Sequence, residues 1–396
     1  MHTAIVIGGG IAGSVTAIAL RKAGFTPVVY EAYDRSADGV GAFLTLASNG
    51  IDALHSVGIA DRVLTDSFET PTMRFLSAGG SVLAELPLGS PSPVSRTVKR
   101  SSLYSALRDE AVRAGIPLHY GKRLVDAHET SDAVVARFAD GTTVSADLLV
   151  GADGLRSRTR TLIDPGAPSA RYVGMLNVGG YARGVDVPGE PGVMHMVFGR
   201  RCFFGYVLHP DGEVWWFANP LSPDKEHGRA MSAMPLHEWR EHLLDLFAGD
   251  DSPAVELVKA TPDLRTGWST YDFPTVPRWR SHRMVIVGDA AHATSPSSGQ
   301  GASQAIEDAV VLARCLRDVE AVPQALVTFE SLRRERVERI VEQGRRNGGF
   351  KTLGWFQRTV VLPVVFRVLA RRGDPLAWAT AHHIDWDAPV RPAPVA

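Results

Sequence analysis

A glycine-rich turn near the N-terminus constrains this chain more strongly than any other feature. An apolar run from Ala4 to Ile7 leads into Gly8-Gly9-Gly10-Ile11-Ala12-Gly13, and a helix-like segment and a second apolar run then lead to Glu31. Strand, glycine turn, helix, strand and acid follow one another in this order in βαβ units that bind dinucleotides. A plain glycine-rich turn in an ordinary α/β domain is the alternative, but the flanking strands and the acid favour a dinucleotide site.

The residues of this turn have separate expected roles. Gly8 allows the tight turn, Gly10 lets the backbone approach a pyrophosphate, and Gly13 lets the helix pack closely on the strand, with Ala12 in the same turn. The phosphates would lie at the helix N-terminus, where the backbone N–H groups are unpaired. Glu31 has the spacing of a carboxylate that binds a ribose hydroxyl and disfavours a 2'-phosphate. FAD or NAD is therefore favoured over NADP.

Composition and charge exclude several classes of function. The chain has 396 residues, 45% of them hydrophobic and 21% charged, which is enough for a large core and two joined domains. A formal net charge of -1 gives no electrostatic reason to bind nucleic acid or an anionic membrane. Cys202 and Cys315 are far apart and belong to no CxxC or Cys/His cluster, so neither a metal site nor a disulfide is predicted. A cytoplasmic location is expected.

Neither apolar stretch that could suggest a membrane segment fits one. The N-terminal stretch lacks the basic leading region of a signal peptide, and its glycines fall where a nucleotide turn needs them. The stretch from Thr359 to Ala370 is interrupted by Pro363 and Arg367 and is shorter than the roughly 20 residues of a spanning helix. We expect a packed C-terminal helix there and no stable membrane insertion.

The remaining pattern predicts an α/β chain with two domains. A Rossmann-like nucleotide-binding domain is expected to comprise residues 1–70, 96–169 and 278–345. Residues 71–95 and 170–277 are expected to form a β-rich substrate domain. Residues 346–396 are expected to form a C-terminal helical segment and tail.

Three further expectations concern single elements. In the β-rich domain, one hairpin around Asp211-Gly212 and a single helix near Pro235 to Phe247 are predicted. The heavily charged helix from Phe329 to Glu342 is expected to face solvent, and the proline-rich tail after Asp387 is expected to be loose.

Two more signatures follow the glycine turn. The first is a buried strand that ends at Gly151-Ala152-Asp153-Gly154 and is followed by Ser157 and Arg160. The second is an apolar strand that ends at Gly288-Asp289-Ala290-Ala291-His292 and is followed by Pro296 and Gly299-Gln300-Gly301. This second pattern places a carboxylate at a strand end and a helix start shortly after it, so it can accept sugar hydroxyls and face an electron-rich ring edge.

In this order and at these separations, the three signatures resemble the single-component FAD-dependent aromatic hydroxylases, the family of p-hydroxybenzoate hydroxylase and the tetracycline-inactivating monooxygenases. The resemblance covers nearly the whole chain and implies that the nucleotide is FAD. It places Arg100 at the start of a helix beside the cofactor, the backbone of Leu124 at the adenine, and Asp153 where it supports the cofactor and contact with the reduced nicotinamide.

The resemblance also positions the flavin ring. The ribityl chain would lie near Asp289, the pyrimidine edge over Gly299, Gly301 and Ala302, and Pro296 next to the reactive carbon. His292 lies near the flavin by its motif position, although a structural role is an equal alternative. No separate nicotinamide domain is implied, so NADH or NADPH would bind only transiently.

Two departures from the family pattern weaken any transfer of substrate detail. The residue after Glu31 is Ala32, where relatives often carry a basic residue, and the loop at 38–42 lacks an arginine that some members use near FAD. Arg35 is a possible substitute.

The function implied is an FAD-dependent, NAD(P)H-consuming monooxygenase that inserts one atom of dioxygen into an aromatic or polycyclic small molecule through a flavin hydroperoxide. The flavin performs the chemistry, so no side chain is predicted to be catalytic, and a dry pocket is needed. Baeyer-Villiger oxidation or epoxidation by a related flavoprotein and a non-catalytic FAD-binding sensor are the alternatives. The substrate, the choice between NADH and NADPH, and the state as monomer or homodimer stay open.

The β-rich domain is expected to build the substrate pocket over the flavin. Its candidate lining residues are aromatic side chains or histidines on predicted strands: Tyr181, His195, Phe204, Tyr206, Trp215 and Phe217. His195 could deprotonate a phenol. Aromatic residues at strand spacing are also typical of plain core, and a satisfied structural histidine is the alternative for His195.

Overall fold

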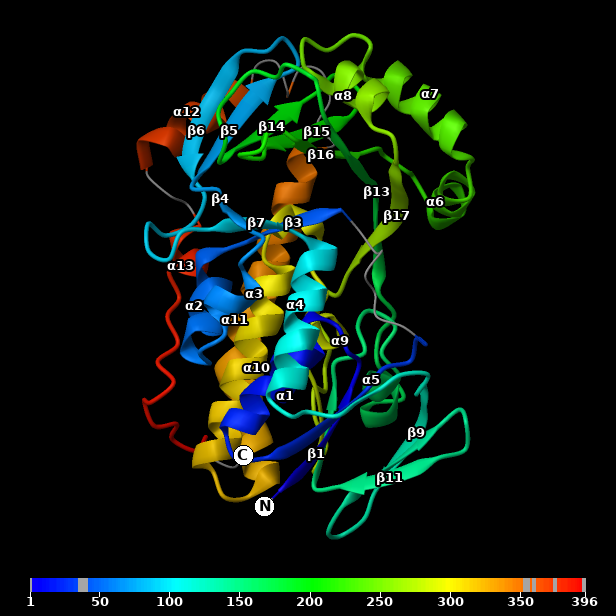
Figure 1. Ribbon diagram of the computed structural model, residues 1–396, viewed down its shortest axis with the longest axis vertical. Helices are drawn as coiled ribbons and strands as arrows, with labels where there is room; N and C mark the ends of the chain where they lie inside the picture. The colour runs from blue at the N-terminus through cyan, green and yellow to red at the C-terminus, as the bar shows by residue number, and fades with distance from the viewer. Residues whose placement is uncertain (1, 35–41, 352–356, 358–360, 373–375, 394–396) are drawn as a thin grey trace.

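The computed structural model describes residues 2–34, 42–351, 357, 361–372 and 376–393. Arg35 and most of the loop at 38–42 lie outside these residues, so the substitute role considered for Arg35 has no structural account. The molecule is elongated, with a parallel sheet in the lower half of Figure 1 and a larger sheet across the top.

The lower sheet is built from five parallel strands in the order β18-β12-β1-β2-β8. Its strands are β1 (Thr3–Ile7), β2 (Thr26–Tyr30), β8 (Leu118–His119), β12 (Leu148–Gly151) and β18 (Met284–Ile286). The central strands are almost continuously apolar because helices cover the sheet. The helices of this half include α1 (Ile11–Lys22), α2 (Ser48–Ser56), α3 (Ala60–Val63), α4 (Arg100–Arg113), α5 (Arg158–Ile163), α9 (Asp289–His292) and α10 (Gly301–Asp318). This arrangement confirms the predicted α/β class.

Two small antiparallel sheets accompany the parallel one. The first contains β9 (Leu124–Glu129), β10 (Val134–Phe138) and β11 (Thr143–Ala146). The second contains β3 (Phe43–Leu46), β4 (Phe68–Glu69) and β7 (Arg96–Lys99), and it lies between the two halves of the molecule in Figure 1.

The upper sheet has seven strands in the order β17-β13-β16-β15-β14-β5-β6. They are β5 (Thr72–Ser77), β6 (Val82–Pro87), β13 (Arg171–Ala182), β14 (Val193–Phe198), β15 (Phe203–Leu208), β16 (Val214–Asn219) and β17 (Arg265–Asp272). The predicted hairpin at Asp211-Gly212 joins β15 to β16. All neighbours are antiparallel except β14 and β5, which run parallel.

The prediction of a single helix in this region is wrong, because three helices follow β16. They are α6 (Lys225–Ser232), α7 (Leu236–Phe247) and α8 (Ala254–Ala260), and their apolar residues form one core with the outer face of the upper sheet. The start of α6 carries a capping signal, since the Asp224 side chain accepts a hydrogen bond from the His227 N–H.

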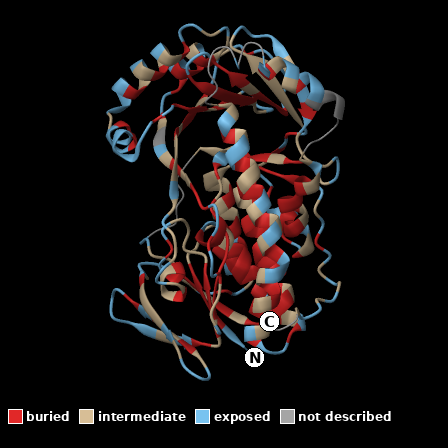
Figure 2. Ribbon diagram, turned by 180° about the vertical axis from the view of Figure 1, so that it is seen from behind, coloured by how far each residue is buried: buried red, intermediate tan, exposed pale blue. Residues whose placement is uncertain are grey.

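A long helix, α11 (Val322–Phe350), joins the two halves (Figure 1). The expectation that its charged stretch faces solvent is wrong for one face, because Arg333 is only 1% exposed and Val337 is fully buried. Figure 2 shows the buried interior of the lower half, which α1 and α10 share with the parallel sheet.

The C-terminal segment forms α12 (Leu362–Arg372) and α13 (Ala377–Thr380), which agrees with the helix predicted around 359–370. The expectation of a loose tail after Asp387 is wrong for the described part. Arg314 donates a hydrogen bond to the Ala388 carbonyl oxygen, and Gln324 donates one to that of Ala393. No helix among the described residues is long and apolar enough to cross a membrane.

Candidate functional site

The glycine turn between β1 and α1 has no room for side chains at two positions. Gly8 has a φ of +103°, and a Cβ on it would lie 2.5 Å from the Ala152 carbonyl oxygen. A Cβ on Gly13 would lie 1.8 Å from the Gly8 carbonyl oxygen. A Cβ on Gly10 would come no closer than 3.6 Å to another group, the Tyr104 Cε1, so there is space beside the N-terminus of α1, which has no side-chain cap.

Glu31 lies directly after β2 and faces this turn. Its Oε2 accepts a hydrogen bond of 2.7 Å from the Gly9 N–H, and its Oε1 accepts one of 2.9 Å from the Tyr33 N–H. The Glu31 carbonyl oxygen accepts a further bond from the Lys122 N–H, which brings the segment that leads to Leu124 alongside. Glu31 and the start of β9 are therefore neighbours, as expected for the two ends of an adenosine site.

Asp153 organises the start of α5. Its Oδ1 accepts a hydrogen bond from the Ser157 hydroxyl, and its Oδ2 accepts bonds from the N–H and hydroxyl of Thr159. Arg160, on the same helix, donates hydrogen bonds to the carbonyl oxygens of Ala290 and Leu155. The second signature is thus tied directly to the third, although 130 residues separate Arg160 from Ala290.

In the third signature, some residues are exposed while their neighbours in the sequence are buried. Asp289 and Gly299 are exposed, whereas the flanking Gly288 and Ala290 are buried. Pro296 begins a short 3-10 helix, η1 (Pro296–Ser298), and is exposed as well. The following helix α10 has no side-chain cap, and its first residues, Gly301 and Ala302, are partly exposed, so its N-terminal N–H groups are available to a ligand.

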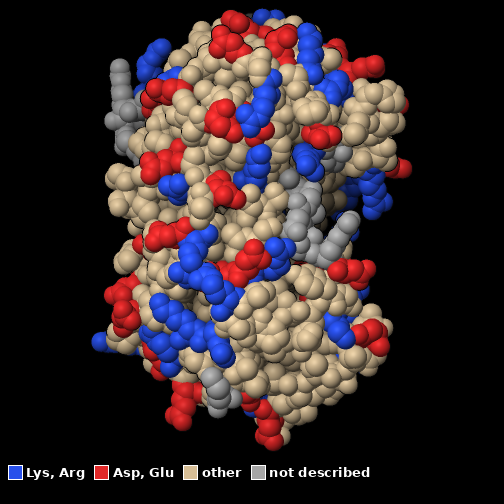
Figure 3. Space-filling view, in the orientation of Figure 1, with Lys and Arg blue, Asp and Glu red and all other residues tan. Residues whose placement is uncertain are grey.

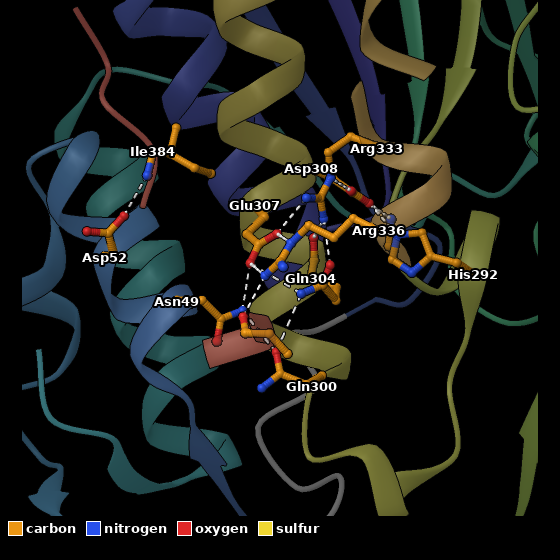
Figure 4. Close-up of polar contacts among 12 residues, drawn as sticks. Asn49, Asp52, His292, Gln300, Gln304, Glu307, Asp308, Arg333, Arg336 and Ile384 are labelled. Carbon is orange, nitrogen blue, oxygen red and sulfur yellow. Dashed lines mark hydrogen bonds and ion pairs between the residues drawn. The ribbon is translucent and has the colours of Figure 1, made fainter. Parts of the chain in front are cut away.

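His292 faces away from this exposed surface into a buried polar cluster (Figure 4). Its Nε2 lies 2.5 Å from Oδ2 of Asp308, and the same oxygen accepts a hydrogen bond from the Gly288 N–H. Arg333 binds the other oxygen of Asp308 at 2.8 Å. The cluster also holds Asn49, Gln300, Gln304, Glu307 and Arg336. This arrangement favours the structural role for His292.

The same cluster fixes the loop before α10. Asn49 of α2 donates hydrogen bonds to Gln300 and Glu307, and Arg336 of α11 binds both oxygens of Glu307. Although burial opposes ionisation, the Arg333 guanidinium holds the pKa of Glu307 below its usual range. The cluster therefore anchors Gln300, next to the proposed flavin contacts, through paired charges.

Arg100 begins α4 and supports the fit of a phosphate-bearing cofactor. Its guanidinium donates a hydrogen bond to the Tyr104 hydroxyl at 3.2 Å, and the Tyr104 ring is the group that a Cβ on Gly10 would face. The Arg100 Nε is buried without a hydrogen-bond partner among the described residues. An unpaired buried donor, an uncapped helix N-terminus and an exposed Asp289 together fit a dinucleotide, and these residues would hold FAD.

The upper sheet sorts the six candidate pocket residues onto two faces, because successive side chains of a strand point to opposite sides. Tyr181, Trp215 and Phe217 lie on the inner face with Phe43 of β3. The Tyr181 hydroxyl donates a hydrogen bond of 2.7 Å to the Ala42 carbonyl oxygen, and the Arg100 N–H donates to the same oxygen. The inner face therefore meets the start of α4.

His195, Phe204 and Tyr206 lie on the outer face, and we withdraw them from the candidate pocket. Phe204 and Tyr206 belong to the core beneath α7 and α8. The His195 ring stacks on Tyr206 at 4.4 Å, its Nδ1 lies 3.0 Å from the Val193 carbonyl oxygen, and burial lowers its pKa to about 4. This is the satisfied structural histidine, not a base that faces the cofactor.

Two inner-face residues escaped the sequence analysis. Phe43 follows the glycine-bearing loop and carried no strand signal of its own. Lys351, at the C-terminal end of α11, donates a hydrogen bond of 2.7 Å to Asn219 of β16. Its partner is 132 residues away, so no local pattern could have identified it.

Comparison with known proteins decides the family. Residues 1–344 match the family described as FAD binding domain. The chain is 34% identical over 359 residues to the 3-amino-4-hydroxybenzoate 2-monooxygenase PtnB3 of Streptomyces platensis, with 87% of each chain covered. It is 31% identical over 360 residues to the aurachin C monooxygenase/isomerase of Stigmatella aurantiaca, with 87% of this chain and 88% of the relative covered. The chain belongs to the FAD-dependent aromatic monooxygenases.

The fold of this monooxygenase agrees with that assignment. The crystal structure of Klebsiella pneumoniae HpxO complexed with FAD and uric acid superposes with a TM-score of 0.82 at 26% identity and covers 93% of both chains. The resemblance inferred from the three signatures is thereby confirmed, and FAD is the cofactor of the family. Within the described residues of the monooxygenase, no group of histidines, cysteines and acids could hold a metal ion.

Proposed function

We propose that this monooxygenase uses NADH or NADPH and dioxygen to insert one oxygen atom into an aromatic or polycyclic small molecule. One observation supports the proposal most directly: a residue of the aromatic inner face and a residue of the proposed cofactor site donate hydrogen bonds to the same carbonyl oxygen. The Ala42 carbonyl oxygen accepts from Tyr181 on the inner face and from Arg100 at the start of α4. A substrate against the inner face would lie beside the cofactor residues.

The residues divide the work of binding and positioning. Gly8, Gly10, Gly13, Ala12 and the N-terminus of α1 would hold the pyrophosphate, and Glu31 with the backbone near Leu124 would hold the adenosine. Asp289, Gly299, Gly301 and Ala302 would hold the ribityl chain and the flavin edge, and Asp153 orients the start of α5. When bound, FAD carries reducing equivalents from the nicotinamide to dioxygen and delivers one oxygen atom to the substrate.

The proposed substrate wall excludes water. Trp215 is 2% exposed, and Phe43, Phe68 and Tyr181 surround it at ring separations of 5.2 to 5.6 Å. Burial raises the pKa of Tyr181 to about 12, so its hydroxyl stays a donor near neutral pH. A dry, aromatic wall of this kind suits oxygen transfer, because water promotes the wasteful release of hydrogen peroxide.

Consumption of NADH and NADPH by the FAD-loaded protein in air tests this function. A panel of phenols, aromatic acids, indoles and polycyclic aromatics is added one at a time, and the products are analysed by mass. We expect at least one compound to accelerate consumption strongly and to gain one oxygen atom. Absence of any nicotinamide consumption by protein that holds FAD would favour the non-catalytic sensor instead. Oxygen inserted into a ring C–C bond or an isolated double bond would indicate Baeyer-Villiger oxidation or epoxidation.

We also propose a cytoplasmic location and a monomer or homodimer. The support for the location is that Cys202 and Cys315 are both buried free thiols.

Figure 3 shows acidic and basic side chains interspersed over most of one face, with one gathering of lysine and arginine in its lower half. Light scattering of the purified protein would distinguish the two oligomeric states.

A further inference from the structure

The C-terminal end of α11 contacts both η1, in the loop where the flavin edge is expected, and the inner face of the upper sheet. A Cβ on Gly344 would lie 2.8 Å from the Ser298 Cβ, so the helix touches η1 there. One turn later, the Asn347 side chain donates a hydrogen bond of 3.2 Å to the Ser297 carbonyl oxygen. The next turn ends at Lys351. The last turns of α11 therefore run from the loop that contains Pro296, the proposed neighbour of the reactive carbon, to the sheet, where Lys351 lies.

Lys351 lies on the inner face beside Phe203 and Phe217, and Phe217 in turn contacts Phe43 of the proposed substrate wall. Its Nζ is 4.2 Å from the centre of the Phe203 ring and 5.9 Å from that of Phe217. The Nζ donates to Asn219 Oδ1 at 2.7 Å. The Asn219 amide nitrogen donates to Asn177 and to the Leu176 carbonyl oxygen, so the orientation of the asparagine is fixed with its acceptor toward Lys351.

The charge of Lys351 lacks a partner among the residues that the structure describes. An ammonium has three N–H donors, and one of them is used by Asn219. None of the ion pairs of the described residues involves Lys351, whereas Lys99, which lies over Tyr181 and Trp215, pairs with Glu213 at 2.9 Å. Burial lowers the pKa of Lys351 to about 7.

The hydroxyl oxygens of Ser297 and Thr294, in and just before η1, are buried without a hydrogen-bond partner among the described residues. Both face α11, because a Cβ on Gly344 would lie 2.8 Å from the Thr294 hydroxyl and a Cβ on Gly348 would lie 3.7 Å from that of Ser297. A ligand between this loop and the inner face would meet the Lys351 cation at one end and aromatic rings along its length.

We propose that Lys351 is a substrate-binding residue that pairs with an anionic oxygen, a carboxylate or an ionised hydroxyl, on the aromatic substrate. The inference rests on the proposed function and narrows its substrate class from aromatic molecules to aromatic anions. The pair compensates the Lys351 charge and holds the ring against Phe217.

The test compares anionic with neutral probes on the FAD-loaded protein. Benzoate is matched with benzamide, and pentafluorophenol, which is ionised at neutral pH, is matched with pentafluoroanisole. Binding is followed through the flavin absorbance. We expect the wild-type protein to bind at least one anion about tenfold to a hundredfold more tightly than its neutral partner, the effect of one charge-assisted hydrogen bond. The pair that responds distinguishes a carboxylate from an ionised hydroxyl.

Variants assign the effect to Lys351. Lys351→Met is expected to abolish the preference for anions, and Lys351→Arg is expected to keep most of it. The matched control is Lys259→Met, which removes an exposed cation of α8 that pairs with Glu256 and should change nothing. If Lys351→Met does not load FAD, lysines of the wild-type protein are dimethylated with 13C-labelled formaldehyde. The NMR signal that is missing from Lys351→Arg should then move with benzoate but not with benzamide.

The outcomes separate the two proposals. Equal binding of anions and neutral partners by the wild type, or an unchanged preference in Lys351→Met, overturns the role of Lys351. Oxygenation of neutral aromatics alone would also overturn it while leaving the monooxygenase function intact. A protein that consumes no NADH or NADPH with any aromatic compound would contradict the function, and the probe preference would still measure the binding site.

Discussion

Glu31 has its orientation fixed by the protein before any ribose is bound. Its two carboxylate oxygens accept from the N–H groups of Gly9 and Tyr33 at 2.7 and 2.9 Å, and each oxygen has a further lone pair for a sugar hydroxyl. The residue therefore shapes the glycine turn and would bind the cofactor with the same groups. Because one carboxylate serves the turn and would also serve the cofactor, the acid at this position could be recognised from the sequence alone.

Substitution of Glu31 by Gln is expected to weaken FAD binding about tenfold to a hundredfold. The amide removes the charge and replaces one acceptor by a donor that opposes a backbone N–H. The dissociation constant is measured by quenching of flavin fluorescence. Glu85→Gln, on the partly exposed Arg74 ion pair of β6, is the control and should bind FAD normally. Equal affinity of Glu31→Gln and wild type would refute the assigned role.

Lys351 is expected to make the affinity for anions depend on pH. A lysine with a lowered pKa is charged below that pKa and neutral above it, so benzoate affinity should fall as the pH rises through 7 and above. The groups that face it are Phe203, Phe217, Asn219 and Cys202, and burial raises the pKa of the Cys202 thiol to about 12, so none of them changes charge in this range. Lys351→Arg should give a flat profile, because arginine stays charged. A wild-type profile as flat as that of the arginine variant would contradict the account.

At the level of elements, the contact between α11 and η1 is possible because Gly344 has no side chain. A Cβ at Gly344 would meet the Ser298 Cβ and the Thr294 hydroxyl at 2.8 Å, whereas a Cβ at Gly349 would meet nothing within 4 Å. The two glycines belong to the same helix, so they form a matched pair. The close contact at Gly344 sets the position of the loop that carries Pro296.

Gly344→Ala is expected to displace this loop, weaken FAD binding and lower the free energy of unfolding by about 1–3 kcal/mol, as overpacking does. Gly349→Ala should leave FAD binding unchanged and stabilise the helix by roughly 0.5–1 kcal/mol. Thermal unfolding and flavin fluorescence of both variants check this. If the two substitutions behave alike, the loop is not held by its contact with α11.

Local patterns predicted the elements that use local signals, and packing decided the rest. The turn at Gly8 to Gly13 and the hairpin at Asp211-Gly212 are encoded by adjacent residues. The face of a strand is not, because strands of the upper sheet are apolar on both sides, and so residues such as Phe204 and Phe217 could not be told apart. Lys351 could not be predicted because its proposed role depends on a contact with Asn219 of a distant strand.

Charge composition misled the prediction for α11 for a related reason. Arg333 reads as a surface residue, but Glu307 and Asp308 of α10 supply two buried carboxylates for its guanidinium. A buried ion pair forms only where the partner is in place, and the sequence of one helix does not reveal the other.

For the whole molecule, this buried polar cluster joins α2, α10 and α11 around the cofactor half (Figure 4). Arg333→Met should lower the free energy of unfolding by about 3–5 kcal/mol, because Glu307 and Asp308 would remain buried with less compensation. Arg346→Met, at an exposed position of the same helix that pairs with Glu342, should change it little. Chemical denaturation measures both. A small loss for Arg333→Met would mean that the cluster is not a main support of the fold.

The proposed division into domains follows sheet membership. The strands of the parallel sheet come from residues 3–151 and 284–286, and those of the upper sheet come from residues 72–87 and 171–272. The substrate would lie where the two halves meet, between the exposed residues of the third signature and the inner aromatic face. We propose that function at this scale depends on α11 and on the hydrogen bond from Tyr181 to the Ala42 carbonyl oxygen, which link the two halves.

The central claim is that one atom of dioxygen enters an aromatic anion held beside FAD. The most direct measurement is the mass of the product formed under 18O-labelled dioxygen from the aromatic acid or phenol that most accelerates NADH or NADPH consumption. The account predicts a product that carries one labelled oxygen atom and loss of its formation in Lys351→Met while FAD remains bound. A product that carries oxygen only from water, or nicotinamide consumption that yields hydrogen peroxide with every compound, would contradict it.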